Sequence, residues 1–376
     1  MKLNIIHQLL IIICLLSFSL KPAFAHHNPT FGLAGTAGPI LTNPASTISK
    51  GHWGIGIRTE YVNFNELSND ALKFFAKDRR FTHSGQYFLS PAIGVAYGAT
   101  NNLTLATRLP YSIQGNITDG LLNTTGMPYI LNRGTSDGLG DLSLFAQYRF
   151  LNLKDKAFES AILTGINIPS GLAHVKDKVG ERFGADHQPS KRAFDPIVGL
   201  AISKRFGHKL SFDSNYLFNK SVKGVQRFYA GDLHNYNLAL SYRLIEQHHH
   251  HHTNDSSAEP SHEHSHEHFY GPPLQEHEFM HSHQHKHKWY SIFGLDTILE
   301  LNGEWRQKQV FGTLQPFGFK DRDNGGHYLY LSPGIRLVIG EHWATYYSLG
   351  LPILQDPNGK GQKVDFRMIF GLSRSF

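Results

Sequence analysis

The sequence predicts an all-β protein, an antiparallel transmembrane β-barrel of about 12 strands. Large apolar residues recur at every second position in twelve segments beyond residue 50. Aromatic residues gather at the ends of these segments, as in strands that cross a bilayer. Only 18% of the 376 residues are charged, whereas 12% are aromatic. Because no stretch beyond residue 25 supplies the roughly 20 consecutive apolar residues of a transmembrane helix, a helical membrane protein is excluded.

The first 25 residues predict a signal peptide. Lys2 gives a positive start, residues 9–20 form an apolar run, and Ala23-Phe24-Ala25 is a cleavage signal. We therefore expect export to the outer membrane of a Gram-negative bacterium. The single cysteine, Cys14, lies in this peptide, so the mature chain has no disulfide, no thiolate metal site and no Cys nucleophile.

Residues 26–50 precede the predicted barrel, which we place at 51–376. From Asn28 this segment is rich in Gly, Pro, Ala and Thr and lacks the alternation of a strand. Two interpretations stay open at this point. The segment either folds into the lumen as a plug or lies in the periplasm.

The predicted strands follow one another from Trp53 to Phe376. They occupy 53–61, 87–97, 103–111, 142–150, 158–168, 194–206, 210–218, 236–244, 289–301, 329–339, 343–351 and 364–376. With both termini periplasmic, the short connections (98–102, 151–156, 207–208 and 340–341) fall on the periplasmic side. The long connections (65–84, 112–138, 169–192, 219–232 and 306–326) then fall outside.

The first external connection contains a predicted amphipathic helix at 68–77. Ser68 is its expected N-cap, and Leu72, Phe75 and Ala76 share one face. This helix is either a lid that faces lipid or substrate, or a packed structural turn.

The strand face opposite the apolar series carries seven arginines and eight acidic residues. A charge that faces lipid at the middle of the bilayer costs roughly 2 to 4 kcal/mol. We therefore expect these side chains to line a polar lumen, and their nearly balanced sign argues against strong ion selectivity. They are Arg58, Glu60, Arg108, Asp141, Arg149, Asp195, Arg205, Asp213, Arg243, Asp296, Glu300, Glu304, Arg336, Asp365 and Arg367.

A histidine-rich insert at 246–287 joins the eighth and ninth predicted strands, which places it in the periplasm by parity. Neutral imidazole is a good ligand for transition metals, so the insert could bind Zn, Cu, Ni or Co. The alternative is a solvated low-complexity loop whose metal affinity has no selected role. No fixed spacing singles out a set of four ligands. The candidate ligands are His248, His249, His250, His251, His252, His262, His264, His266, His268, His277, His281, His283, His285 and His287.

Several motifs resemble those of outer-membrane proteins of the phenol-degradation meta-pathway family. They are Gly51-His52-Trp53, Glu60-Tyr61-Val62-Asn63-Phe64, His83-Ser84, Arg108-Leu109-Pro110-Tyr111, Gly138-Leu139-Gly140-Asp141-Leu142 and Ile168-Pro169-Ser170-Gly171. The resemblance implies a transporter-like outer-membrane barrel, and the histidine-rich insert departs from it. The terminal Phe376 with its alternating aromatics is similar to the signal that the barrel assembly machinery binds.

The sequence thus predicts an outer-membrane channel for small solutes whose insert concentrates a transition metal. The alternative is a passive transporter of small hydrophobic or aromatic compounds with an incidental insert. An enzyme, for example a lipid hydrolase, is not expected, since the pattern places no Ser/His pair on an apolar face near the outer rim. No cofactor is expected to be required. The expected partners are outer-membrane lipids and a small-molecule or metal-ion solute. Despite the net charge of +6, the scattered basic residues argue against nucleic acid.

Overall fold

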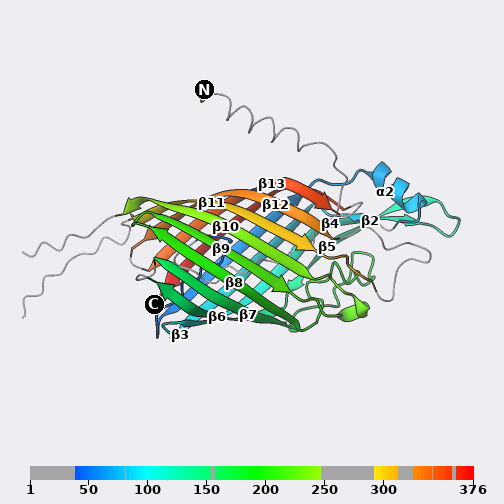
Figure 1. Cartoon of the computed structure of the whole chain (residues 1–376). Helices are drawn as coiled ribbons and strands as arrows, with labels where there is room; N and C mark the ends of the chain where they lie inside the picture. Colours follow the sequence, from blue (N-terminus) through cyan, green and yellow to red (C-terminus); the bar gives the residue numbers. More distant parts are fainter. Residues whose placement is uncertain are drawn as a thin grey trace, which may run out of the picture.

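Alternating apolar and polar residues fold this chain into a closed barrel of antiparallel strands (Figure 1). The computed structural model describes residues 39–80, 82–153, 157–246, 292–311, 325–340, 342–357 and 361–376. The predicted signal peptide at 1–25 and residues 247–287 of the histidine-rich insert lie outside the described residues, so both stay predictions. Within the described residues, no helix is long and apolar enough to span a bilayer.

Twelve of the strands in the described residues close the ring, which confirms the predicted fold class. They are β1 (Trp53–Phe64), β3 (Tyr87–Thr100), β4 (Leu103–Leu122), β6 (Leu142–Leu153), β7 (Phe158–Ile168), β8 (Asp195–Phe206), β9 (Leu210–Asn219), β10 (Leu233–Glu246), β11 (Ile292–Arg306), β12 (Gly326–Ile339), β13 (Trp343–Pro357) and β14 (Val364–Ser375). Each pairs with its neighbours in the ring. The ring closes where β1 pairs with β14 and where β4 pairs with β6.

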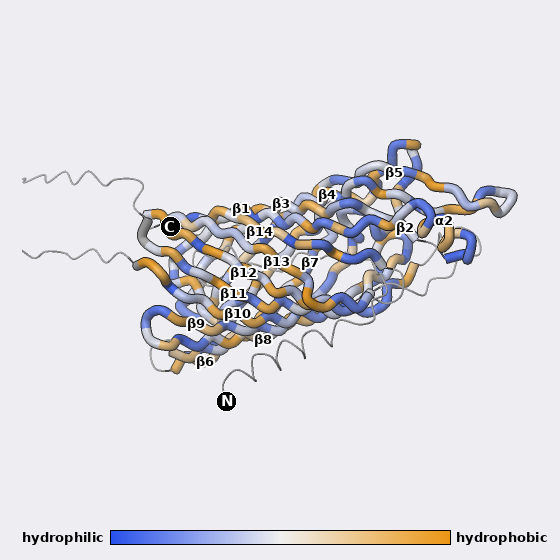
Figure 2. The backbone as a smooth tube through the Cα atoms, turned by 90° about the horizontal axis from the view of Figure 1, so that it is seen from above, coloured by the Kyte–Doolittle hydropathy of each residue, from blue (hydrophilic) through white to orange (hydrophobic). Residues whose placement is uncertain are grey.

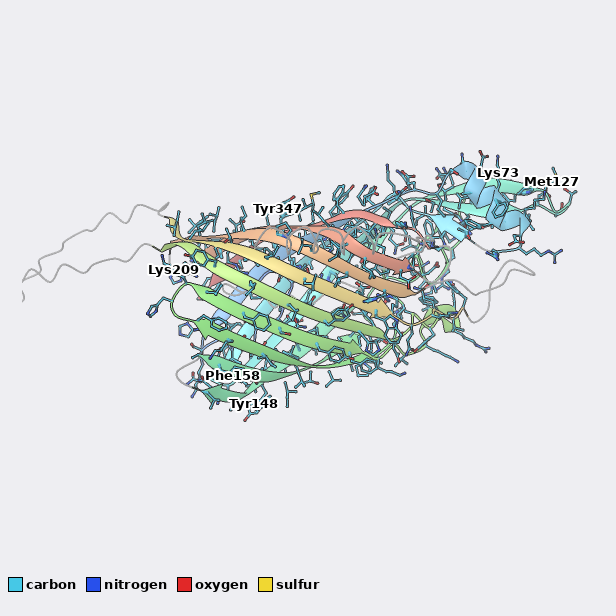
Figure 3. The ribbon with its side chains drawn as sticks, turned by 45° about the horizontal axis from the view of Figure 1, so that its top comes forward. Lys73, Met127, Tyr148, Phe158, Lys209 and Tyr347 are labelled. Carbon is cyan, nitrogen blue, oxygen red and sulfur yellow. The ribbon has the colours of Figure 1, made fainter. Side chains whose placement is uncertain are left out.

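The strands turn apolar side chains outward and charged ones inward, as the period of two requires. On β12, Ile335 is 45% exposed on the outer surface, whereas the adjacent Arg336 is 2% exposed. Orange and blue segments alternate along the strands in Figure 2. Tyr148 and Tyr347 project from the outer wall in Figure 3, and both are exposed. A hydrocarbon layer around the barrel would therefore meet an apolar surface.

The two ends of the barrel differ in the length of their connections. Short turns and the C terminus occupy one end, here called the inner end, and α2 lies at the opposite, outer end (Figure 1). In Figure 3, Lys209 marks an inner turn, whereas Lys73 and Met127 lie at the outer extreme. The outer connection at 220–232 includes a short 3-10 helix, η1 (Val225–Arg227).

One outer connection differs from the sequence prediction. Residues 112–138 were expected to form a long loop, but β4 continues to Leu122 and pairs with β5 (Pro128–Leu139). Asn123 closes this hairpin, because its side-chain Oδ1 accepts hydrogen bonds from the backbone N–H groups of Thr125 and Met127. The hairpin projects beyond the barrel, where neither face meets lipid, so its sequence lacks the apolar alternation that identified the other strands.

Helix α2 (Asn69–Lys77) packs on this projecting hairpin. Ser68 caps it as predicted, since its Oγ accepts a hydrogen bond from the Ala71 N–H at 3.2 Å. Leu72 and Ala76 are buried, and the close approach to β4 occurs at Gly120. A Cβ at that glycine would lie 2.4 Å from the Leu72 carbonyl oxygen. The packed position favours the structural turn over the lid, and the short strand β2 (Thr82–Ser84) pairs with β4 beside it.

Candidate functional site

Residues 39–50 run through the interior of the barrel and form its plug. An irregular backbone inside a barrel must find hydrogen-bond partners outside itself. The lumen strands supply them as inward side chains. Glu300 of β11 accepts hydrogen bonds from the N–H groups of Leu41 and Thr42 at 3.0 and 2.9 Å. The sequence left open whether this segment is a plug, and these contacts place its described part in the lumen.

Further strands hold the plug along its length. Asn215 of β9 accepts from the Asn43 N–H at 2.8 Å, and Ser203 of β8 accepts from the Ala45 N–H at 2.8 Å. Gln147 of β6 donates to the carbonyls of Pro44 and Ser46. Finally, Thr104 of β4 accepts from the Ile48 N–H, and Arg336 of β12 donates to the Pro39 carbonyl. The plug thus crosses the lumen from β12 to β4.

Apolar contacts complete the seat of the plug. Ile40 and Leu41 are buried against Ile298 and Ile369 of the wall. Opposite Ile40, β12 carries Gly334, where a Cβ would lie 2.6 Å from the Ile40 Cδ1. The interior is therefore not purely polar, in contrast to the sequence prediction. Inward apolar residues of the wall were not recognised as lumen residues because their neighbours on the outer face are apolar as well.

The described residues enclose an outer and an inner cavity on the two sides of the plug. Strand β10 shows their order along the barrel: Leu233 lines the outer cavity, Asn237 lines a small hollow at Leu41, and Arg243 lines the inner cavity. The outer cavity measures about 170 Å³ and the inner one about 590 Å³. The plug lies between them, so it obstructs the direct path through the barrel.

The outer cavity combines apolar side chains with amides and charged groups. Its apolar side chains come mainly from β1, β3, β4, β8, β9, β10 and the connection at 220–232, and its amides from β4, β7, β9, β10 and the outer connections. Its charged side chains are those of Arg108, Asp141, Asp186, Lys191, Asp195 and Arg306. The apolar ones include Phe64, Phe88, Leu217, Phe228 and Leu233, and the amides include Gln114, Asn219 and Asn235.

A chain of neutral hydrogen-bonding side chains lies at the level of the plug. Asn237 donates to Asn215 at 3.3 Å, and Asn302 donates to Asn237 at 3.1 Å. Ser332 continues the chain, since its hydroxyl donates to Asn302 at 2.7 Å. These four residues come from β9, β10, β11 and β12. A solute that passes the plug would meet amide groups here in addition to the charges of the wall.

The structure buries eleven of the fifteen side chains that the sequence assigned to the lumen. These are Arg58, Glu60, Arg108, Arg149, Asp195, Asp213, Asp296, Glu300, Glu304, Arg336 and Arg367. Asp141 and Arg243 are half-buried and line the outer and the inner cavity, respectively. Arg205 is exposed where it lines the inner cavity.

Asp365 does not fit the assignment to the lumen. The register between β1 and β14 shifts between Asn63 and Phe64, which leaves Asp365 as an extra residue in β14. Such a bulge reverses the facing of the residues beyond it. Val364 is consequently buried at 1% exposure, whereas Asp365 is exposed and accepts a hydrogen bond from the Asn63 side chain.

Ion pairs balance many of the inward charges. Arg243 pairs with Asp296, and Arg149 pairs with Glu159. Glu159 was not among the lumen residues predicted from the sequence. Glu159 precedes the inward residues Ala161 and Leu163 by two and four positions, so the alternation of β7 could have identified it. Arg306 was missed because it lies in a predicted connection, and it pairs with Glu304 at 3.3 Å.

The external connection at 169–194 is fastened to the barrel and its hairpin by charged groups. Lys191 Nζ lies 2.7 Å from Asp195 Oδ2. Burial lowers the pKa of Lys191, and the nearby Asp195 carboxylate opposes this shift without outweighing it. Arg133 of β5 reaches the same connection, where its Nη1 donates to Asp177 Oδ2 at 2.6 Å.

One set of described residues could hold a metal ion, and it lies in the wall of the outer cavity. His83, Asp186 and His187 are buried, and their ligand atoms lie within 4.8 Å of one another. The fourteen histidines that the sequence predicted as ligands lie outside the described residues.

Comparison with known proteins supports the fold. No protein-family model matches the chain, and no curated protein matches its sequence. Among solved structures, an outer membrane channel from Pseudomonas putida F1 has a TM-score of 0.51 at 12% identity, over 88% of this chain and 98% of that chain. The NanC porin has a TM-score of 0.40 at 9% identity, over 85% of this chain and 98% of that one. The Pseudomonas putida toluene transporter TodX has a TM-score of 0.39 at 9% identity, over 95% and 99% of the two chains.

These likenesses differ in what they support. At 12% identity, the first shows that this chain shares the fold of an outer-membrane β-barrel. The TM-scores of the other two are below 0.5, so they add no argument. Since no family model matches, the resemblance to the phenol-degradation meta-pathway family stays a prediction.

Proposed function

We propose that this protein is an outer-membrane channel through which small hydrophobic or aromatic compounds pass passively. The observation that carries this proposal is the group of apolar side chains, Phe64, Phe88, Leu217, Phe228 and Leu233, that lines the outer cavity of a closed barrel. The apolar outer surface of the strands supports a position in the outer membrane. The proposal assigns no catalytic role to the chain. It corresponds to the alternative, rather than the leading, function inferred from the sequence.

The size of the outer cavity sets the size of the solute. An apolar cavity of roughly 150 Å³ admits a benzene molecule, and the outer cavity measures about 170 Å³. Phe228 and Leu233 offer apolar surface, whose burial against a ring contributes about 25 cal/mol per Å². The amides of Gln114 and Asn235 can bind a polar substituent. The cavity therefore suits one substituted ring.

Passage from the outer to the inner cavity requires the plug to shift. The plug is held by hydrogen bonds and by the contacts of Ile40 and Leu41 with Ile298 and Ile369. A solute with an apolar body can replace the apolar contacts as it moves along the wall. A strongly hydrated solute cannot, because it would lose water without gaining equivalent partners.

The test compares two organic anions of the same charge in liposome swelling assays. With the full-length protein in phospholipid vesicles, benzoate should enter faster than gluconate, which is a polar carboxylate. In the Phe228→Ala variant, the ratio of the two rates should fall severalfold, because Phe228 is buried in the cavity wall. Phe74→Ala is the matched control, since Phe74 is 67% exposed on α2.

Equal rates for benzoate and gluconate in the native protein would reject selection by the apolar side chains of the cavity. An unchanged ratio in Phe228→Ala would reject the outer cavity as its location. Metal handling by the histidine-rich insert stays a separate prediction, and swelling in metal salts with and without residues 246–287 addresses it.

A further inference from the structure

We propose that His83, Asp186 and His187 form a binding site for one divalent transition-metal ion, such as Zn²⁺, in the wall of the outer cavity. His83 Nε2 and His187 Nε2 each lie 3.7 Å from the same oxygen, Asp186 Oδ2. All three residues are less than 9% exposed. The site is distinct from the histidine-rich insert, and its existence does not depend on the proposed solute.

The spacing of the ligand atoms suits a small cation. Atoms bound about 2.0 to 2.2 Å from a tetrahedral zinc ion stand about 3.3 to 3.6 Å apart. The two distances of 3.7 Å lie just above this range. The imidazole rings of His83 and His187 lie edge to face, with centroids 4.1 Å apart.

A neighbouring amide orients His187 for metal binding. His187 Nδ1 lies 2.9 Å from Gln114 Oε1, and an amide oxygen can only accept a hydrogen bond. The ring proton is therefore on Nδ1, which leaves the lone pair of Nε2 directed at the carboxylate of Asp186. Histidines that bind metals are oriented by a hydrogen bond of this kind from their second nitrogen.

Three outer segments bring the ligands together. His83 belongs to β2, which pairs with β4, whereas Asp186 and His187 belong to the connection at 169–194. The Ser136 hydroxyl of β5 donates to the His187 carbonyl at 2.6 Å, which fixes the backbone of that connection. A bound ion would tie this connection to β2 at the edge of the outer cavity. The arrangement of β2, β4 and β5 at the outer end is visible in Figure 1.

The donor set selects the class of ion. Two imidazoles and one carboxylate favour Zn²⁺, Co²⁺, Ni²⁺ or Fe²⁺ over Ca²⁺ and Mg²⁺, which prefer oxygen ligands. Three protein ligands leave a fourth position for water or for an anionic group of a solute. The site therefore adds a Lewis-acidic contact to the apolar, amide and charged side chains that line the cavity.

The experiment measures a change beside the proposed ligands, because total zinc binding would include any zinc bound by the histidine-rich insert. Trypsin digests the full-length protein in detergent with and without Zn²⁺, and mass spectrometry follows cleavage after the exposed Arg182, four residues before Asp186. At a zinc concentration 100 times the Kd, stabilisation of the closed connection should slow this cleavage up to about 100-fold. His83→Ala and His187→Ala should abolish the slowing, whereas the matched control His174→Ala, an exposed histidine of the same connection, should retain it.

The proposed site would be rejected if zinc did not change the rate of cleavage at Arg182 in the native protein. It would also be rejected if zinc slowed this cleavage equally in His187→Ala. If the alanine variants fail to assemble, Asp186→Asn removes a charged ligand at nearly constant volume. Its assembly can be verified by heat-modifiable migration in gels. The metal content per chain gives a second readout: Asp186→Asn should bind one Zn²⁺ fewer than His174→Ala, and equal contents would contradict the proposal.

Discussion

At the scale of single residues, Glu300 explains why the plug stays in the lumen. It is fully buried, and its carboxylate accepts hydrogen bonds from two successive plug N–H groups. Hydrogen bonds to a charged group stabilise by about 1.5 to 3 kcal/mol, more than neutral ones. The sequence predicted Glu300 as an inward residue, but its partners Leu41 and Thr42 could not be predicted, because they lie more than 250 positions away.

Glu300→Gln should release the plug. The side chain keeps its size, but it loses its charge and presents an NH₂ group to two N–H donors. A loss of about 1.5 to 3 kcal/mol would make displacement of the plug about 10- to 140-fold more frequent. Single-channel recording in planar bilayers measures the frequency of open events. Asp195→Asn is the control, since it removes a lumen charge away from the plug, and equal frequencies in both variants would disprove this role.

At the scale of elements, the external connection at 169–194 depends on Asp177. This carboxylate accepts hydrogen bonds from Arg133 and from the backbone N–H groups of Val179 and Glu181. Burial by itself raises the pKa of Asp177, but these hydrogen bonds together outweigh burial and hold the pKa below its usual value. The sequence indicated that residues 169–192 form an external loop, yet nothing in its pattern indicated that β5 would fasten it.

The lowered pKa of Asp177 predicts a loop that opens in acid. A depressed folded-state pKa contributes stability that is fully present above the unfolded pKa of about 3.9 and is lost as the pH falls through the folded value. Hydrogen exchange at 177–181, corrected for the intrinsic effect of pH, should therefore accelerate below about pH 4. In Asp177→Asn, exchange should be faster at neutral pH and nearly independent of this titration. A native protein without acceleration in acid would refute the linkage.

At the scale of the whole molecule, the barrel is specified by which face of each strand meets lipid. Ile335 lies near the middle of the outward series from Leu329 to Ile339 on β12, and Arg336 beside it faces the lumen. Ring closure between β1 and β14 leaves no unpaired edge within the barrel. This pattern could be predicted from the sequence, because each charge that faces lipid costs free energy. In the described strands, charged residues are therefore absent from the outward positions near mid-bilayer.

Ile335→Lys should destabilise the barrel in a bilayer by about 2 to 4 kcal/mol, the cost of a charge on the lipid face near mid-bilayer. Denaturant titration of the full-length protein in lipid vesicles measures this free energy of unfolding. Ser241→Lys is the matched control, since Ser241 lines the inner cavity, where a lysine can meet water. A similar loss in both variants would contradict the assignment of the faces.

The sequence by itself determined the class of fold, the twelve barrel strands and the inward position of most of their charges. Those properties depend on the alternation of neighbours along one strand and on the solvent that each face meets. Only the tertiary structure decided the course of the plug, the outer hairpin and the cluster of His83, Asp186 and His187. Each of these depends on partners from segments far apart in the chain, whose meeting is set by closure of the ring and by the folding of its outer connections.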